Sequence, residues 1–327
     1  MSGNSSEMVF KMHLECSEIE SIYKDPMWSI QTNAIIVGVL SSFLAITATA
    51  GNLIILIMFI RTPSLHNPSN TLIGSLCLCD LLIGSIFQPI FIIKYFLEAA
   101  DVYVCTLTNI TEYSFSTSSS IALLTITLIS IDRYIAVCWP FIYQVRAESV
   151  KYLKILAVIW VVIFVFFLLG YQGVIKLDYI FMTAAIFCVL SIVLTIACYI
   201  AIYCAVLYQR RGVAAEIPAP LEGDEPVSAV PKQKEERSKS LTIGLIVIAL
   251  FVCFLPHWLA SVTLTQLGIN PPIRYLYQMW CSLVAFANST LNPIIYIYRN
   301  KTLKESTKEI LRKGLLRRRN LVTNLQQ

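Results

Sequence analysis

Residues 151–171 read KYLKILAVIWVVIFVFFLLGY, and no charged side chain follows Lys154 in this stretch. An α-helix rises about 1.5 Å per residue, so about 20 such residues cross the roughly 30 Å hydrocarbon core of a bilayer. A helix is also the only open element that satisfies all of its backbone groups internally when it lies in lipid. The stretch therefore predicts a transmembrane α-helix.

Six further stretches are apolar over a similar length, and the connections between them are short. With the first, they place seven spans near residues 32–60, 69–97, 105–137, 151–171, 177–208, 238–266 and 272–298. The composition agrees, because 57% of the residues are hydrophobic and 14% are charged, whereas soluble proteins carry about 25% charged residues. We therefore predict an all-α integral membrane protein, built as a seven-transmembrane helix bundle.

Lysine and arginine are distributed unequally between the two sides of this bundle. With seven spans the termini lie on opposite sides; the N-terminal side then holds five of the 25 basic residues and the other side holds twenty. Basic residues concentrate in cytoplasmic loops, so we predict an extracellular N-terminus and a cytoplasmic C-terminus. The N-terminal tail, residues 1–31, carries the glycosylation sequon Asn4-Ser5-Ser6 on the outer side.

Two segments on the cytoplasmic side have distinctive compositions. Residues 210–237 carry four prolines and alternating charge, which predicts a flexible linker without a fold of its own. Residues 301–316 place apolar side chains at helical spacing among lysines and arginines. This pattern predicts a short amphipathic cytoplasmic helix that lies on the anionic inner leaflet, with a solvated charged tail as the alternative. Residues 317–327 then form the cytoplasmic tail.

Several polar side chains lie inside the predicted spans, where each requires a reason. A charged residue at the centre of a spanning helix costs roughly 2.5–3.5 kcal/mol on insertion scales. Asp80 lies well inside the second span and Asn52 inside the first. Asn288, Ser289 and Asn292 lie in the seventh span. These groups could meet in the bundle interior around water or a small cation.

Helix-breaking residues interrupt two of the spans. Pro256 lies in the sixth span and Pro293 in the seventh, and a proline inside a helix removes a hydrogen bond and leaves a bend. The acidic–basic pair Asp132-Arg133 ends the third span at its cytoplasmic side. Each feature alone has a structural explanation that is at least as good as a functional one. Together, in this order and on these spans, they are specific.

The complete set of motifs resembles that of rhodopsin-like (class A) G-protein-coupled receptors over about residues 33–313. The motifs on successive spans are Gly51-Asn52, Leu76-x-x-x-Asp80, Asp132-Arg133-Tyr134, Trp160, Cys253-x-x-Pro256 and Asn292-Pro293-x-x-Tyr296. The resemblance implies a plasma-membrane receptor whose extracellular ligand shifts an inactive–active equilibrium and which activates a heterotrimeric G protein. It also implies arrestin and a receptor kinase as partners, contact with membrane lipid and no binding of nucleic acid.

The resemblance also implies roles for the residues of the cytoplasmic half. Arg133 would hold the inactive state and then contact the G protein, with Glu236 as its acidic partner; a solvated Glu236 is the alternative. Tyr199 and Tyr296 would stabilise the open state. The full set of switch and coupling residues is Asp132, Arg133, Tyr134, Phe141, Tyr199, Glu236, Pro256, Asn292, Pro293 and Tyr296.

By the same resemblance, Asp80 with Asn52, Asn288, Ser289 and Asn292 would form a pocket for an allosteric sodium ion. Ala122 stands where a serine often contributes, so we expect a weakened or altered ion site. We expect no other cofactor or metal, because the sequence has no C-x-x-C pair or histidine cluster. A nucleophile–base arrangement is also missing, so enzyme activity finds no support. A small membrane transporter is disfavoured because we see no internal repeat.

The pattern departs from most of the class at the extracellular side. Thr108 occupies the position of the usual disulfide cysteine, and Cys105 comes three residues earlier. The loop after the fourth span is short and has no cysteine, and Ser191 replaces the usual proline of the fifth span. These features are similar to those of melanocortin receptors and, less closely, to those of the cannabinoid, lysophospholipid and adenosine receptors. Asn292 departs from melanocortin receptors, which have aspartate there.

The ligand class is narrowed mostly by exclusion. Aminergic receptors carry an aspartate where this chain has Phe115, and opsins need a lysine that the seventh span does not contain. By resemblance we expect a peptide ligand of the melanocortin-receptor kind, with a lipid or a nucleoside as the alternatives. Candidate pocket residues by matching position are Lys94, Thr111, Glu112, Phe115, Ser116, Phe254, His257, Trp258 and Gln278.

Glu112 is the most informative of these candidates, because a carboxylate near the outer end of the third span needs a cationic partner. Lys94 at the outer end of the second span is the best partner within the chain. A cationic group of the ligand is the alternative.

Three cysteines can reach the oxidising side of the membrane, namely Cys16, Cys105 and Cys281. We expect Cys16 to form a disulfide with either Cys105 or Cys281, which would attach the N-terminal tail to the bundle. Three free thiols are the alternative.

Overall fold

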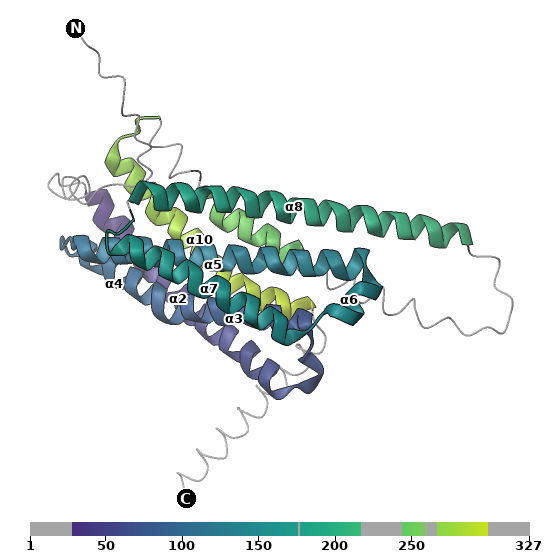
Figure 1. The fold of residues 1–327 in the computed structure, drawn as a ribbon. Coiled ribbons are helices and arrows are strands. Elements are labelled where there is room, and N and C mark those ends of the chain that lie inside the picture. Colours follow the sequence, from purple (N-terminus) through teal and green to yellow (C-terminus); the bar gives the residue numbers. More distant parts are fainter. Residues whose placement is uncertain (1–27, 176, 217–243, 258, 260–266, 300–327) are drawn as a thin grey trace, which may run out of the picture.

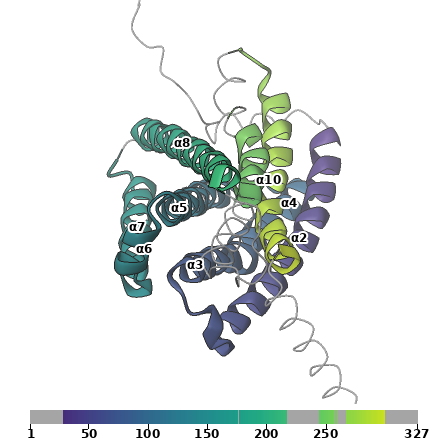
Figure 2. The same cartoon turned by 90° about the vertical axis from the view of Figure 1, so that its right-hand side faces the viewer.

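The computed structural model describes residues 28–175, 177–216, 244–257, 259 and 267–299. The long helices of these ranges run side by side in one bundle, as Figure 1 shows from the side and Figure 2 along the helices. The helical elements, long and short, are α2 (Trp28–Arg61), α3 (Pro68–Leu82), η2 (Ile83–Phe87), α4 (Gln88–Ala99), α5 (Cys105–Cys138), α6 (Pro140–Arg146), α7 (Ser149–Tyr171), α8 (Leu177–Glu216) and α10 (Pro271–Arg299). A further apolar helix covers Gly244–His257, and a 3-10 turn, η1 (Pro63–Leu65), joins α2 to α3.

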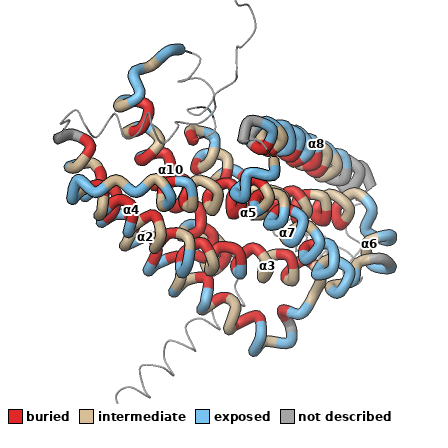
Figure 3. The backbone as a smooth tube through the Cα atoms, turned by 60° about the vertical axis from the view of Figure 1, so that its left-hand side comes forward, coloured by how far each residue is buried: buried red, intermediate tan, exposed pale blue. Residues whose placement is uncertain are grey.

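Five of these helices are long and apolar enough to cross a membrane: α2, the continuous helix α3–η2–α4, α5, α7 and the part of α8 up to Tyr208. Large apolar side chains on their outer faces are exposed, such as Phe43 on α2 at 64% and Val161 on α7 at 62%. Figure 3 shows the buried residues on the faces that meet inside the bundle. Lipid must cover the outer faces, since water would not tolerate so much exposed apolar surface. The predicted all-α membrane protein with long apolar helices is confirmed.

One span contains a widened turn with a clear cause. Pro89 lacks an N–H group, and its ring would press on the carbonyl of Ser85 in a regular α-helix. Over η2 the helix opens into a π-turn, in which the Gln88 N–H bonds to the carbonyl of Ile83. The extra residue rotates α4 relative to α3. The π-turn therefore decides which side chains of α4 face the interior.

The helix of the fifth predicted span extends further on the cytoplasmic side than the sequence predicted. Helix α8 continues to Glu216, so the linker predicted for residues 210–237 begins later than expected. The apolar pattern ends at Tyr208, but helix hydrogen bonds do not require apolar side chains and the helix continues past it. Several predicted features lie outside the described residues. They are the rest of that linker with Glu236, the predicted amphipathic helix 301–316, the tail 317–327, the N-terminal residues 1–27 with Asn4 and Cys16, and Trp258.

The buried side chains of the described residues form three clusters, and two of them lie beside the candidate sites. One contains Phe91, Tyr95 and Phe115 and lies in the half that we predict to be extracellular. Another contains Leu76 and Tyr296 and lies in the opposite half. Polar residues between and beside these clusters form the candidate sites.

Candidate functional site

The centre of the bundle holds a buried carboxylate, Asp80, which is 0% exposed on α3. Ser289 on α10 donates its hydroxyl to Asp80 Oδ1 at 2.7 Å, and Asn292 donates its amide to Oδ2 at 2.7 Å. Hydrogen bonds to a charged acceptor are stronger than neutral ones, especially at such short distances. The two bonds therefore tie α10 to α3 at mid-membrane depth.

A second side chain extends this network to α2. Asn52, also 0% exposed, donates its amide to the carbonyls of Ala48 and Ser289, each at 2.9 Å. The side-chain oxygens of Asn52, Asn288 and Asn292 are buried and have no hydrogen-bond partner among the described residues.

These residues fit a small hard cation, which prefers carboxylate and amide oxygens as ligands. Asp80 supplies the charge, and the three buried amide oxygens are acceptors that the described chain leaves unused. Ala122, buried on α5, adds no oxygen. No cluster of three or more histidine, cysteine, aspartate or glutamate residues occurs in the described part of the chain.

The cytoplasmic half contains a fully buried arginine, Arg133, at 0% exposure. It donates from Nε to Asp132 Oδ2 at 2.9 Å and from Nη2 to the Tyr143 hydroxyl at 3.0 Å. The guanidinium also lies 5.7 Å from the centre of the Tyr143 ring. The predicted partner Glu236 lies outside the described residues, so that pairing remains a prediction. The sequence analysis did not identify Tyr143. The sequence shows only a tyrosine one helical turn after Pro140, at the start of α6, and this pattern does not indicate a contact with Arg133.

The other predicted switch residues lie around this site. Tyr296 is 2% exposed, and Tyr199 packs against the same cluster. Their hydroxyls have no hydrogen-bond partner among the described residues. A Cβ on Gly51 would lie 3.0 Å from Pro293 Cβ, so the close approach of α2 to α10 requires a glycine. Phe141 on α6 is 84% exposed.

The opposite half contains an aromatic site around Phe115 on α5, which is 4% exposed. Four other aromatic rings among the described residues surround the Phe115 ring. The distances between ring centres are 4.3 Å to His257, 5.8 Å to Phe286, 6.1 Å to Phe254 and 6.2 Å to Phe91. Phe91 and Phe286 were not among the sequence candidates. The predicted candidates Thr111 and Ser116 are buried on the same helix, and Gln278 is half-buried on α10.

Beyond the aromatic rings lies a buried ion pair on α4. Lys94 Nζ lies 3.7 Å from Glu98 Oε1, and Tyr275 on α10 donates its hydroxyl to the same oxygen at 2.5 Å. Glu98 and Tyr275 were missed, because nothing in the sequence distinguishes Glu98 from a surface acid at a helix end. The expected Lys94–Glu112 pair is not the ion pair observed here, since Lys94 faces its own helix neighbour. Glu112 is half-buried on α5.

The outer cysteines differ from one another. Cys105 is disulfide-bonded, whereas Cys281 is a free, buried thiol. A bond between Cys16 and Cys281 is therefore absent, and so is the state with three free thiols. Cys16 lies outside the described residues.

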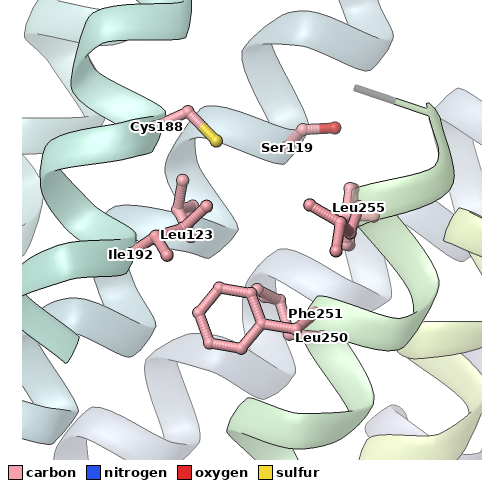
Figure 4. A pocket seen from close by; sticks show the side chains of 8 residues that line it. Ser119, Leu123, Cys188, Ile192, Leu250, Phe251 and Leu255 are labelled. Carbon is pink, nitrogen blue, oxygen red and sulfur yellow. The ribbon is translucent and has the colours of Figure 1, made fainter. Parts of the chain in front are cut away.

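A small cavity lies between α5, α8 and the helix Gly244–His257 (Figure 4). Its volume is about 30 Å³, and its lining is apolar apart from Ser119 and Cys188. A water molecule needs about 10–15 Å³ of such volume, so the cavity has room for only about two or three waters.

Comparison with known proteins agrees with this arrangement. The chain matches the family "7 transmembrane receptor (rhodopsin family)" over residues 51–174 and 171–296. It is similar to trace amine-associated receptor 8c of Mus musculus, at 26% identity over 89% of this chain and 90% of that protein. It is also similar to trace amine-associated receptor 7a of Rattus norvegicus, at 28% identity over 86% and 84% of the two chains. The chain is therefore a multi-pass membrane receptor and not an enzyme, and it belongs to the rhodopsin family of seven-transmembrane receptors.

Proposed function

We propose that this receptor binds an extracellular ligand between the outer ends of its helices and activates a heterotrimeric G protein at the cytoplasmic ends. The observation that carries the proposal is the burial of Arg133, which Asp132 and Tyr143 hold inside the bundle. A buried guanidinium that is held by side-chain hydrogen bonds can change partners when the helices move. Outward movement of the helix that contains Pro256 would expose the Arg133 guanidinium to the C-terminal helix of a Gα subunit.

The proposed topology follows the charge distribution. The N-terminus is extracellular and the C-terminus cytoplasmic, because twenty of the 25 lysines and arginines lie on the C-terminal side. Residues 301–316 form an amphipathic helix on the inner leaflet of the plasma membrane. Asn4 carries a glycan.

The proposed ligand is a peptide with a cationic group that binds near Glu112. Phe115 is surrounded by rings, and aromatic rings favour an apolar or cationic group over an anion. Glu112 lies three residues earlier on α5 and so shares the helix face of Phe115. Among the relatives, the name trace amine-associated receptor favours a small amine as a second candidate, with Glu112 as its counter-ion in place of an aspartate at position 115.

The proposed cation site binds sodium through Asp80, Asn52, Asn288, Ser289 and Asn292. Its support is the buried carboxylate of Asp80, which Ser289 and Asn292 contact, together with buried amide oxygens that have no partner among the described residues. Because Ala122 contributes no oxygen, the affinity for sodium is low.

The proposed partner of Cys105 is Cys16. Eight of the ten cysteines are free and Cys105 is disulfide-bonded, which leaves Cys16 as the remaining thiol of this chain. Peptide mapping of surface-expressed receptor under non-reducing conditions should recover a Cys16–Cys105 peptide pair. Recovery of Cys16 as a free thiol contradicts the pairing.

The function is tested by signalling in cells that express the receptor with a panel of Gα subtypes. A library of basic peptides, small aromatic amines such as tyramine, nucleosides and lysophospholipids is applied to wild type and to Arg133→Ala. We expect a basic peptide to activate wild type, and Arg133→Ala to bind the same peptide without activating the G protein. Normal coupling by Arg133→Ala contradicts the mechanism, and activation by another ligand class alone contradicts the peptide assignment.

A further inference from the structure

The ion pair on α4 is almost completely enclosed. The side chains of Lys94 and Glu98 are 5% and 2% exposed. The Lys94 ammonium lies 5.5 Å from the centre of the Tyr95 ring and 5.2 Å from that of Tyr275. The two rings and the carboxylate thus surround the ammonium on several sides, at a position where α4 meets α10.

This pair leaves hydrogen-bonding groups unused. The 3.7 Å between Lys94 Nζ and Glu98 Oε1 exceeds hydrogen-bond distance, so the two charged groups attract one another without sharing a hydrogen bond. Glu98 Oε2 is buried and has no partner there either. Buried polar groups in proteins are nearly always hydrogen-bonded, because leaving one unpaired is costly. The pair therefore offers a strong donor and a strong acceptor side by side.

The pair is adjacent to the aromatic site. Phe91, Tyr95 and Glu98 follow one another at spacings of four and three residues, so they lie on one face of α4, and all three are at most 2% exposed. Phe91 contacts Phe115 and Phe286 in the aromatic site. Seven residues of helix separate Phe91 from Glu98, a rise of roughly 10 Å. The ion pair therefore lies on the same face of α4 as Phe91, about two helical turns from the aromatic site.

We propose that Lys94 and Glu98 together recognise an amide group of the ligand. The amide carbonyl accepts a hydrogen bond from the Lys94 ammonium, and the amide N–H donates one to Glu98 Oε2. The pair is neutral as a whole, so it suits a neutral group with adjacent donor and acceptor. A carboxylate would be repelled by Glu98, and an ammonium by Lys94.

The inference rests on the proposed role as a ligand receptor, and it assigns the chemistry that this site selects. A peptide bond or a terminal carboxamide supplies an amide, which agrees with a peptide ligand. A nucleobase also carries a neighbouring donor and acceptor, so the experiment includes a nucleoside.

The experiment measures binding of three small probes to purified full-length receptor by thermal stabilisation, without any G protein. The probes are 3-phenylpropanamide, 3-phenylpropanoate and 3-phenylpropylamine, which share a phenyl group for the aromatic site and differ only at the polar end; adenosine is the fourth. We expect wild type to bind the amide at least about tenfold more tightly than the acid or the amine, as loss of a hydrogen bond to a charged group predicts.

Variants of the pair should change this preference in a defined direction. Glu98→Gln leaves an isolated cation and should prefer the acid, whereas Lys94→Met leaves an isolated anion and should prefer the amine. Lys94→Met/Glu98→Gln leaves no unpaired charge, so it should fold and lose the preference for the amide. Lys151→Met, which breaks the exposed Lys151–Glu148 pair on α7, should bind all probes like wild type.

Two results would overturn the assignment. One is an equal or weaker affinity of wild type for the amide than for the acid and the amine. The other is a preference for the amide that survives in Lys94→Met/Glu98→Gln. If adenosine binds wild type more tightly than the amide does, and if this preference is lost in Lys94→Met/Glu98→Gln, then the pair recognises a nucleobase and the amide assignment is wrong. Since no G protein is present, failure here is separate from failure of the proposed signalling.

Discussion

The contact between Arg133 and Tyr143 predicts that a single hydroxyl restrains ligand-free signalling. Tyr143→Phe removes the hydroxyl that accepts from Arg133 Nη2 at 3.0 Å, but keeps the ring at 5.7 Å from the guanidinium. The substitution therefore removes this hydrogen bond and keeps the aromatic ring. Asp132 continues to hold the arginine through its own bonds.

The magnitude follows from burial. Arg133 is 0% exposed, so water cannot readily replace the lost acceptor. A hydrogen bond to a charged group contributes about 1.5–3 kcal/mol, and the retained ring interaction and the Asp132 bonds favour the lower value. If the bond is made only in the inactive state, its loss shifts the equilibrium by about 1.5 kcal/mol. This corresponds to about a tenfold higher ratio of active to inactive receptor.

The assay is nucleotide exchange on Gα in membranes that contain the receptor without ligand, normalised to surface expression. Tyr143→Phe should raise basal exchange severalfold, up to the tenfold limit. The matched control is Tyr203→Phe, because Tyr203 on α8 is 65% exposed and far from this network in sequence; it should leave basal exchange unchanged. Basal exchange at the wild-type level in a well-expressed Tyr143→Phe receptor would refute the restraint.

Three further predictions concern the other sites. Glu236→Ala should raise ligand-free signalling if Glu236 pairs with Arg133 at rest; unchanged basal activity at normal expression would exclude that pair. Sodium at about ten times its dissociation constant should stabilise purified receptor by about 1.4 kcal/mol, and Asp80→Asn should abolish this effect; stabilisation that persists in the variant would place sodium elsewhere. If a cationic group of the ligand binds Glu112, agonist potency should fall about tenfold or more in Glu112→Gln at normal expression. Poor surface expression would instead assign Glu112 a structural role.

The sequence alone determined the membrane class and the family. In lipid every backbone group must bond within its own segment, so an apolar stretch such as residues 151–171 could only be a helix. The motifs identified by resemblance also placed Asp80, Ser289 and Asn292 in one proposed site, and the structure joins these three side chains by hydrogen bonds. The spacing of residues within each helix and a known family pattern were sufficient to predict this site.

Only the tertiary structure decided which side chains meet between helices. Spanning helices are apolar toward lipid and toward the bundle alike, so periodicity does not show which face lies inside. The π-turn before Pro89 adds a rotation that no propensity scale predicts. That rotation orients Glu98 toward Tyr275, a partner 177 residues away in the sequence. Tyr143 likewise reaches Arg133 because α6 packs against α5. These contacts depend on the relative rotation of packed helices, which the linear sequence does not specify.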